Sequence, residues 1–253
     1  MKKAIIIGAT SGIGLEVARQ LLGRGWHIGV AGRREEALQA LRTTAPDRVE
    51  TERIDVTADD APQRLRALIG RLGGMDLFFL SSGIGYQNPA LDPDIELRTA
   101  RTNVEGFIRM TTAAFACFKE RQAEGLLPPE GGHIAVISSI AGTKGLGAAP
   151  AYSATKRFQN TYIDALEQLA RMQRLRIRFT DIRPGFVATD LLRGGHYPML
   201  MRPERVAHHI VNALERRKRV AVIDARYRLL VFFWRLIPRA VWKRMPVGGG
   251  KEK

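Results

Sequence analysis

The sequence predicts an α/β fold: one doubly wound parallel sheet of about seven strands, with helices on both faces. Short apolar runs alternate along the chain with longer segments of helical periodicity, as expected for βα units. The first apolar run also leads through a glycine-rich turn, residues 8–14, directly into a helical segment. The length of 253 residues is sufficient for one large domain with its own core.

The elements follow from these patterns in chain order. Strands are predicted at residues 3–7, 27–31, 49–55, 75–81, 133–138, 176–182 and 220–223. The run at 75–81 is almost continuously apolar, which is typical of a buried parallel strand. Helices are predicted at residues 12–24, 35–44, 59–72, 94–124, 152–174 and 203–217. Residues 190–202 form a short lid-like segment that favours a hydrophobic substrate, because its apolar side chains are Leu191, Leu192, Tyr197, Met199, Leu200 and Met201.

The composition indicates a globular protein of a reducing compartment. Hydrophobic residues make up 45% and charged residues 26% of the chain. The only cysteine, Cys117, lies in an apolar helical run, and we interpret it as a buried free thiol. The apolar run after Lys2 and Lys3 is too short for a signal peptide, and no stretch of 18 apolar residues predicts a membrane-spanning helix. We therefore expect a cytoplasmic location.

The net charge of +15 is distributed unevenly along the chain. Residues 193–253 hold 15 Lys and Arg against 4 Asp and Glu, a balance of +11. Residues 1–192 hold 25 against 21, a balance of +4. A basic C-terminal part indicates an anionic partner, either a membrane surface or nucleic acid. The alternative is that the charge only keeps the protein soluble.

The glycine-rich turn is a candidate dinucleotide site. Its glycines allow the backbone to approach a pyrophosphate, whose charge is favoured at the N-terminus of the following helix. The alternative is a glycine-rich turn that holds no nucleotide. The candidate binding residues are Gly8, Thr10, Ser11, Gly12, Ile13 and Gly14.

The end of the second strand indicates which dinucleotide this site prefers. An acidic residue there would bind the ribose hydroxyls of NAD, but the chain has Gly32 followed by Arg33. A guanidinium group binds a phosphate through two hydrogen bonds, so Arg33 favours NADP (NADPH). The alternative is that Arg33 and Arg34 are surface residues at a turn.

Tyr152 and Lys156 are the candidate catalytic pair. A spacing of four places both side chains on one face of a helix. An ammonium group near a phenol lowers the phenol pKa, so Tyr152 is expected to exchange a proton with a substrate oxygen. Ser139 precedes Tyr152 by thirteen residues, at a strand end where ligands of parallel sheets bind. Taken alone, a Tyr–Lys pair is also consistent with a solvated helix face.

These motifs together resemble the short-chain dehydrogenase/reductase family over about residues 3–190. The glycine spacing G-x3-G-x-G, Ser139, the Tyr152–Lys156 pair and the later Pro184-Gly185 carry the resemblance. It implies a Rossmann-type fold, catalytic Asn103, Ser139, Tyr152 and Lys156, and a water-mediated proton path from Lys156 to Asn103. It also implies a homodimer or homotetramer, because the family's helix equivalent to 152–174 commonly packs on a second subunit.

The resemblance extends the cofactor site to residues that the spacing alone does not identify. These are Asp55 and Val56 on the adenine side, Ser82 and Gly83 near the nicotinamide ribose, and Pro184, Gly185, Val187 and Thr189 near the carboxamide, with Asn103, Tyr152 and Lys156 again at the nicotinamide end. The chain departs from the family pattern at Ile7, a usual threonine, and at Leu80 and Ser81, where two asparagines are usual. No metal site is expected, since the adjacent His208 and His209 point apart.

The basic C-terminal segment, residues 226–253, follows a catalytic domain at residues 1–225. On a helical wheel the basic residues occupy one sector and the apolar residues the opposite one, with Trp234 and Trp242 at the borders. The basic sector contains Arg228, Arg235, Arg239 and Lys243, and the apolar sector contains Leu229, Leu230, Phe233, Ile237 and Val241. This pattern is typical of an interfacial membrane helix, which Pro238 kinks or restarts. The alternative is packing on the lid or on a second subunit. Nucleic acid is disfavoured, because bulky aliphatic residues separate the basic ones.

The sequence as a whole predicts an NADP(H)-dependent oxidoreductase, peripherally associated with the inner face of a membrane if the C-terminal segment binds lipid. We expect it to interconvert a ketone and a secondary alcohol on an apolar, lipid-, acyl- or steroid-like substrate. The alternative is a non-catalytic NADPH-binding regulatory protein. The complete Ser139, Tyr152, Lys156 and Asn103 set argues against that alternative, because a binding protein needs no proton donor.

Overall fold

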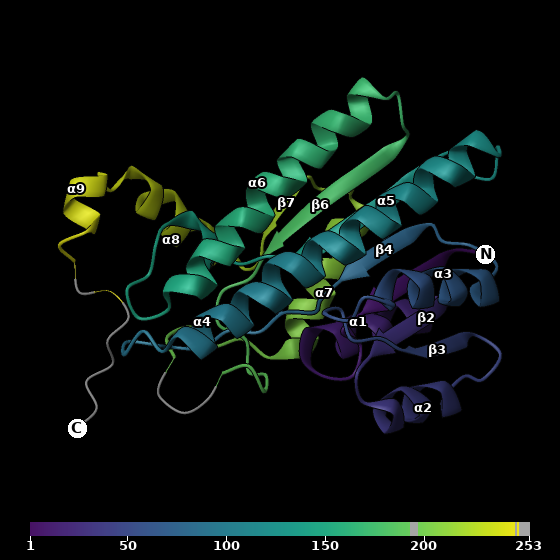
Figure 1. The fold of residues 1–253 in the computed structure, drawn as a ribbon, viewed down its shortest axis with the longest axis horizontal. Helices are drawn as coiled ribbons and strands as arrows, with labels where there is room; N and C mark the ends of the chain where they lie inside the picture. Colours follow the sequence, from purple (N-terminus) through teal and green to yellow (C-terminus); the bar gives the residue numbers. More distant parts are fainter. Residues whose placement is uncertain (193–196, 246, 248–253) are drawn as a thin grey trace.

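The computed structural model describes residues 1–192, 197–245 and 247 of the chain (Figure 1). Within these residues seven parallel strands form one sheet in the order β3-β2-β1-β4-β5-β6-β7, which confirms the predicted doubly wound sheet. The order reverses between β1 and β4, where the carboxyl ends of parallel strands leave a crevice for ligands. The strands are β1 (Lys3–Ile7), β2 (His27–Gly32), β3 (Val49–Arg53), β4 (Leu77–Leu80), β5 (Gly132–Ile137), β6 (Ile177–Arg183) and β7 (Val220–Val222).

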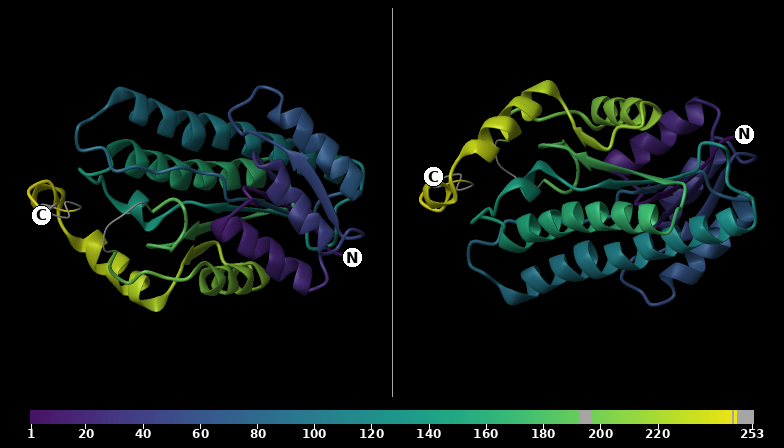
Figure 2. Two further views of the ribbon diagram at one scale, coloured as in Figure 1. Left: turned by 90° about the horizontal axis from the view of Figure 1, so that it is seen from below. Right: turned by 90° about the horizontal axis from the view of Figure 1, so that it is seen from above.

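Helices cover both faces of the sheet and bury two apolar cores (Figure 2). Successive side chains of β1 alternate between the cores, Ile6 in one and Ile5 and Ile7 in the other, as strand geometry requires. One core is closed by α1 (Gly12–Gly23), α2 (Glu35–Thr43) and α7 (Pro203–Glu215). The other is closed by α3 (Ala61–Leu72), α5 (Phe107–Ala123) and α6 (Pro150–Met172). The predicted buried thiol, Cys117, lies in this second core.

The helix predicted at 94–124 is interrupted. A π-helical turn, η1 (Arg101–Gly106), separates α4 (Pro93–Ala100) from α5, and it contains Asn103. The extra residue of such a turn commonly marks a functional site. Here it accompanies a fully buried Asn103 whose side chain bonds the backbone of Ile84 in both directions. Apolar periodicity does not predict this interruption, because hydrogen bonds outside the helix stabilise it.

The C-terminal segment forms two helices, α8 (Ala225–Leu236) and α9 (Arg239–Trp242), separated at Pro238 as predicted. The inner face of α8 belongs to the main domain, since Tyr227 is fully buried and Val231 nearly so. The Tyr227 hydroxyl donates to the Pro198 carbonyl and accepts from the Phe186 amide. The predicted alternative of packing on the lid is therefore confirmed for this face. None of the described helices is long and apolar enough to span a bilayer.

Candidate active site

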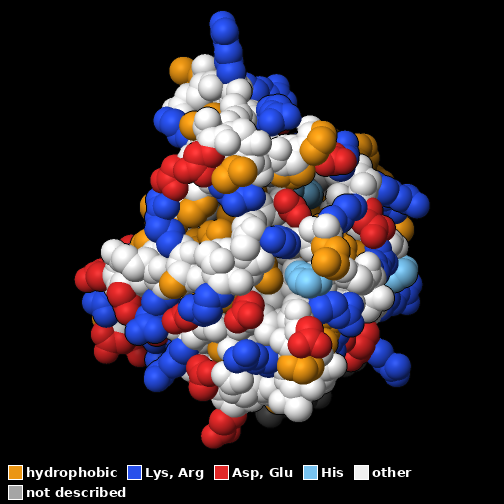
Figure 3. Space-filling model, turned by 90° about the vertical axis from the view of Figure 1, so that its right-hand side faces the viewer, with side chains coloured by type: hydrophobic (Ala, Val, Ile, Leu, Met, Phe, Trp, Pro, Cys, Tyr) orange, Lys and Arg blue, Asp and Glu red, His pale blue; other side chains and the backbone are white. Residues whose placement is uncertain are grey.

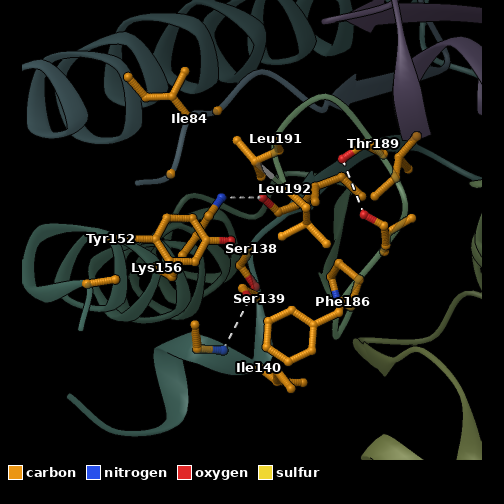
Figure 4. Close-up of a pocket in the computed structure, with 18 of the residues that line it drawn as sticks. Ile84, Ser138, Ser139, Ile140, Tyr152, Lys156, Phe186, Thr189, Leu191 and Leu192 are labelled. Atoms are coloured by element: carbon orange, nitrogen blue, oxygen red, sulfur yellow. Dashed lines mark hydrogen bonds between the residues drawn. The ribbon is translucent and has the colours of Figure 1, made fainter. Parts of the chain in front are cut away.

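A cavity of about 1580 Å³ opens at the carboxyl ends of the strands. This volume exceeds the roughly 300–1,000 Å³ of a typical small-molecule pocket, so it offers room for a dinucleotide and a substrate together. Sixteen of the eighteen predicted cofactor residues line it, and Gly14 and Asn103 do not. Ser139, Tyr152 and Lys156 lie together on its wall, with Phe186, Leu191 and Leu192 nearby (Figure 4).

The glycine-rich turn is shaped so that side chains are excluded from it. Gly8 has a φ of +88°, and a Cβ there would lie 2.7 Å from the Ser82 amide nitrogen. A Cβ at Gly14 would lie 2.1 Å from the Gly8 carbonyl oxygen, so Gly14 allows α1 to pack against the turn rather than lining the cavity. The open backbone at the start of α1 fits a pyrophosphate, which helix N-termini attract.

Two arginines, Arg33 and Arg34, follow the end of β2, and only Arg33 was predicted to bind the cofactor. Arg33 is exposed and lines the cavity. Arg34 also lines it, and its guanidinium donates to the Thr10 hydroxyl over 3.3 Å. Gly32 packs closely on Thr10, since a Cβ there would lie 2.6 Å from the Thr10 methyl carbon. An acidic side chain at position 32 would therefore have to displace the Thr10 side chain.

Asp55 stays ionised on the cavity wall, just beyond the end of β3. Burial raises its pKa, but hydrogen bonds from the Thr57 amide and hydroxyl, at 2.9 and 2.7 Å, and the charges of Arg33 and Arg53 outweigh burial. The net result is a pKa below the usual carboxyl value. Val56 is buried beside Asp55 and also lines the cavity.

The expected fall in the pKa of Tyr152 is not found. Burial raises this pKa, and a hydrogen bond with Ser139 only partly offsets the rise. Burial outweighs the attraction of the Lys156 ammonium, which lies 5.8 Å from the centroid of the Tyr152 ring and bonds Ile137 and Gln159. Tyr152 is therefore a protonated phenol at neutral pH, with Ser139 as its hydrogen-bond partner.

Lys156 is buried and is held by two acceptors, the Ile137 carbonyl at 3.1 Å and the Gln159 side-chain oxygen at 3.0 Å. Burial lowers the pKa of Lys156 to about 8, and the charge of Asp181 opposes this fall. The Gln159 amide in turn donates to the Asn103 carbonyl over 2.9 Å. Gln159 thus bridges the Lys156 ammonium and the Asn103 backbone.

A buried polar network supports the end of β5. Asp181 of β6 is completely buried and accepts from the Arg183 guanidinium at 2.6 Å, from the Asn160 amide at 2.9 Å and from the Ser138 hydroxyl. Asn160 lies on α6, one turn beyond Lys156. The network therefore connects α6 to β5 and β6 next to Ser139. Ser138, Asn160 and Asp181, for which no role was predicted, are structural members of it.

The remaining cavity wall is apolar and comes largely from the C-terminal third of the chain. Four of the six predicted lid residues line it, whereas Leu200 is exposed and Met201 is buried outside it. The Phe186 and Tyr197 rings contact each other with centroids 5.0 Å apart. The α8–α9 segment, which was not predicted to reach the site, adds Leu230, Phe233, Trp234, Ile237 and Trp242.

Several known proteins have sequences similar to most of this chain. Residues 2–195 match the family model for short chain dehydrogenases. An uncharacterized oxidoreductase of Myxococcus xanthus is 34% identical over 78% of this chain and 77% of its own. Dehydrogenase/reductase SDR family member 7B of Bos taurus is 30% identical over 98% of this chain and 82% of its own. Farnesol dehydrogenase of Aedes aegypti is 28% identical over 87% of this chain and 93% of its own.

The fold has a counterpart among solved structures. A 3-ketoacyl-(acyl-carrier-protein) reductase of Brucella melitensis, in complex with NADH, superposes with a TM-score of 0.76 at 22% identity, over 88% of this chain and 96% of its own. The sequence matches and this shared architecture agree with each other. The chain belongs to the short-chain dehydrogenase/reductase family, whose members are oxidoreductases acting on alcohol and carbonyl groups.

Proposed function

We propose that this protein is an NADP(H)-dependent oxidoreductase that interconverts a ketone and a secondary alcohol on an apolar, lipid-, acyl- or steroid-like substrate. The observation that carries the proposal is the single cavity that extends from Arg33 and the glycine-rich turn, past Ser139, Tyr152 and Lys156, to a wall of apolar side chains. Cofactor, proton donor and apolar substrate can therefore meet in one enclosed volume.

The cofactor end of the cavity fits an NADP(H) molecule. The turn at residues 8–14 would accept the pyrophosphate, Arg33 with Arg34 the 2′-phosphate, and Asp55 with Val56 the adenine side. Lys156, with its ammonium 3.4 Å from the Cβ position of Gly83, would reach the nicotinamide ribose. When bound, the nicotinamide supplies or accepts the hydride.

Proton transfer falls to Tyr152. Because burial raises its pKa, the hydroxyl stays protonated at neutral pH and can donate to a substrate oxygen during ketone reduction. Ser139 would bind the same oxygen. The charged Lys156 ammonium beneath the ring would stabilise the phenolate that remains, and the Gln159 contact with Asn103 holds that ammonium in place.

The apolar wall supports the substrate class. Hydrophobic side chains of the lid and of α8 line the cavity beyond Tyr152, and burial of apolar substrate surface contributes about 25 cal/mol per Å². The similarity to farnesol dehydrogenase, an enzyme named for an apolar alcohol, agrees with this assignment.

The proposal is tested by following NADPH absorbance with ketosteroids, β-oxoacyl thioesters and long-chain ketones, each beside a short-chain ketone of the same type. We expect the long substrates to give the higher kcat/KM. Equal values for long and short members contradict the apolar site. Tight NADPH binding without turnover of any ketone favours the non-catalytic regulatory alternative.

The ionisation of Lys156 predicts a pH dependence. Below its pKa of about 8 the lysine is charged and supports the phenolate, and above it this support is lost. We therefore expect kcat/KM for NADPH, which reports ionisation in the free enzyme, to be constant below pH about 8 and to fall as the pH rises through it. A fall that begins only near 10.5, the ordinary lysine pKa, contradicts this interpretation.

Gln159→Leu provides the matched variant for this profile. The substitution removes an acceptor from the charged ammonium, which lowers the pKa of Lys156 further. The fall in kcat/KM should then move to lower pH. A profile that coincides with that of the wild type would mean that Gln159 does not position the lysine.

A further inference from the structure

The outer face of α8 exposes five large apolar side chains in about two turns of helix. Leu229, Phe232 and Leu236 are 61%, 58% and 64% exposed. Phe233 and Leu230, at 57% and 41%, continue this surface toward the cavity. These five residues are named the outer face of α8 below. Contiguous exposed apolar surface of this kind marks an interaction site in a folded protein.

Basic side chains lie on α8 beside the outer face and in the residues that follow it. Arg228 and Arg235 lie on α8, and Arg239, Lys243 and Arg244 follow within the next eight residues. Arg226 is paired with Asp224, the single acidic residue between positions 216 and 251. The opposite end of the molecule differs, because Figure 3 shows acidic and basic side chains interspersed there. The segment that carries the apolar surface is therefore strongly positive.

The outer face is held rigidly by contacts on its other side. The Tyr227 hydroxyl donates to the Pro198 and Met199 carbonyls at 3.1 and 3.2 Å. Further along, Lys144 donates to the Ile237 carbonyl over 2.8 Å, and the Trp242 indole donates to the Gly145 carbonyl over 2.7 Å. Binding through a surface that is already ordered avoids the entropic cost of folding a segment.

The expected helix and the observed one differ in which residues face outward. The predicted apolar sector included Ile237, and the two tryptophans were placed at its borders. In the structure Trp234, Ile237 and Trp242 point toward the cavity, and the Trp234 and Trp242 rings contact each other with centroids 5.2 Å apart. Phe232 and Leu236 take their place on the outer face.

We propose that the outer face of α8 and its basic border dock the protein onto the surface of an anionic phospholipid bilayer. The five apolar side chains would enter the interface while the arginines and lysines meet phosphate and carboxylate groups of the lipids. Since Leu230 and Phe233 belong both to this face and to the cavity wall, docking places the cavity opening at the bilayer. The benefit of this position rests on the proposed function, because an apolar substrate would be found in the bilayer.

The charge favours a bilayer over a second copy of the chain. In a two-fold dimer the same patch lies on both subunits, so the basic residues of one would approach those of the other. Like charges brought together in this way oppose association, and the centres of protein interfaces are depleted of charged residues. An anionic surface neutralises the same charges instead.

The test is co-sedimentation of the full-length protein with vesicles of phosphatidylcholine alone or of phosphatidylcholine with phosphatidylserine. We expect binding to the anionic vesicles at low salt, at least tenfold stronger than to the neutral ones, and weaker as the salt concentration rises. Leu229→Ser with Phe232→Ser and Leu236→Ser should reduce binding at least tenfold, as should Arg228→Gln with Arg235→Gln. The matched controls, Leu126→Ser and Arg42→Gln, alter exposed residues outside this surface and should leave binding unchanged.

Three outcomes overturn the proposal. The first is that the wild type stays in the supernatant with anionic vesicles at low salt. The second is that the triple serine variant binds as strongly as the wild type. The third is that size-exclusion chromatography shows the loss of a dimer in this variant, which would assign the face to a second copy of the chain. Leu229, Phe232 and Leu236 do not line the cavity, so unchanged NADPH binding and an unchanged unfolding temperature show that the variant is folded. Vesicle binding is measured without substrate and therefore does not depend on the proposed reaction.

Discussion

Tyr152→Phe is expected to lower turnover by about 10²–10⁴-fold, the usual contribution of a general acid, while NADPH binds with nearly wild-type affinity. The substitution keeps the ring between Lys156 and Gly85 and removes only the hydroxyl that bonds Ser139. Because the hydroxyl is the single group proposed to give a proton to the substrate oxygen, no neighbouring side chain replaces it. Steady-state turnover and fluorescence titration with NADPH measure the two quantities separately.

Tyr162→Phe is the matched control for this prediction. Tyr162 lies on the same helix but packs against Phe107 and Phe158, with ring centroids 5.9 and 5.4 Å away, and it does not line the cavity. Loss of the Tyr162 hydroxyl should leave turnover within a few-fold of the wild type. If Tyr152→Phe also retains turnover at that level, Tyr152 is not the proton donor.

The sheet and the cofactor turn were predictable because local patterns determine them. Apolar runs such as β4 have to be buried on both sides, and the glycines of the turn satisfy steric requirements that the structure shows directly at Gly8 and Gly14. Spacing also sufficed to bring Ser139, Tyr152 and Lys156 together, since one helix carries two of them and a strand end the third.

Features that depend on long-range contacts were not predictable. The π-helical turn accompanies a bond between Asn103 and Ile84, nineteen residues apart in sequence. The pKa of Tyr152 was predicted to fall because Lys156 is one turn away, but burial outweighs a lysine whose ammonium bonds Ile137 and Gln159. Gln159 itself carries a weak signal, since it follows Lys156 by three residues and shares its helix face.

Of the two interpretations that the sequence left open for the C-terminal segment, the structure shows packing on the lid. Its pattern of basic and apolar residues predicts a helix with two distinct faces, but not which face is buried. Tyr227 decides the orientation, because its ring fills the space beside Gly185, where an added Cβ would lie 2.1 Å from the ring. Packing on the lid thus leaves Leu229, Phe232 and Leu236 exposed.

Arg33→Ala is expected to weaken NADPH binding by about ten- to a hundredfold and to leave NADH binding nearly unchanged. The basis is the loss of a charge-assisted hydrogen bond to the 2′-phosphate, worth roughly 1.5–3 kcal/mol, which NADH does not make. Arg33 is suited to this contact because it is exposed and lines the cavity. Titrations of the wild type and the variant with both cofactors measure the effect.

Two further variants show whether the effect belongs to position 33. Arg34→Ala should cost less, because Arg34 also bonds Thr10 and is only partly available to a ligand. Arg42 lies on α2, the helix that follows Arg34, and does not line the cavity, so Arg42→Ala should change the affinity for neither cofactor. A Gly32→Asp substitution would also disturb Thr10, since its Cβ would lie 2.6 Å from the Thr10 side chain. Equal affinities of the wild type for NADPH and NADH would rule out the preference, whatever the variants do.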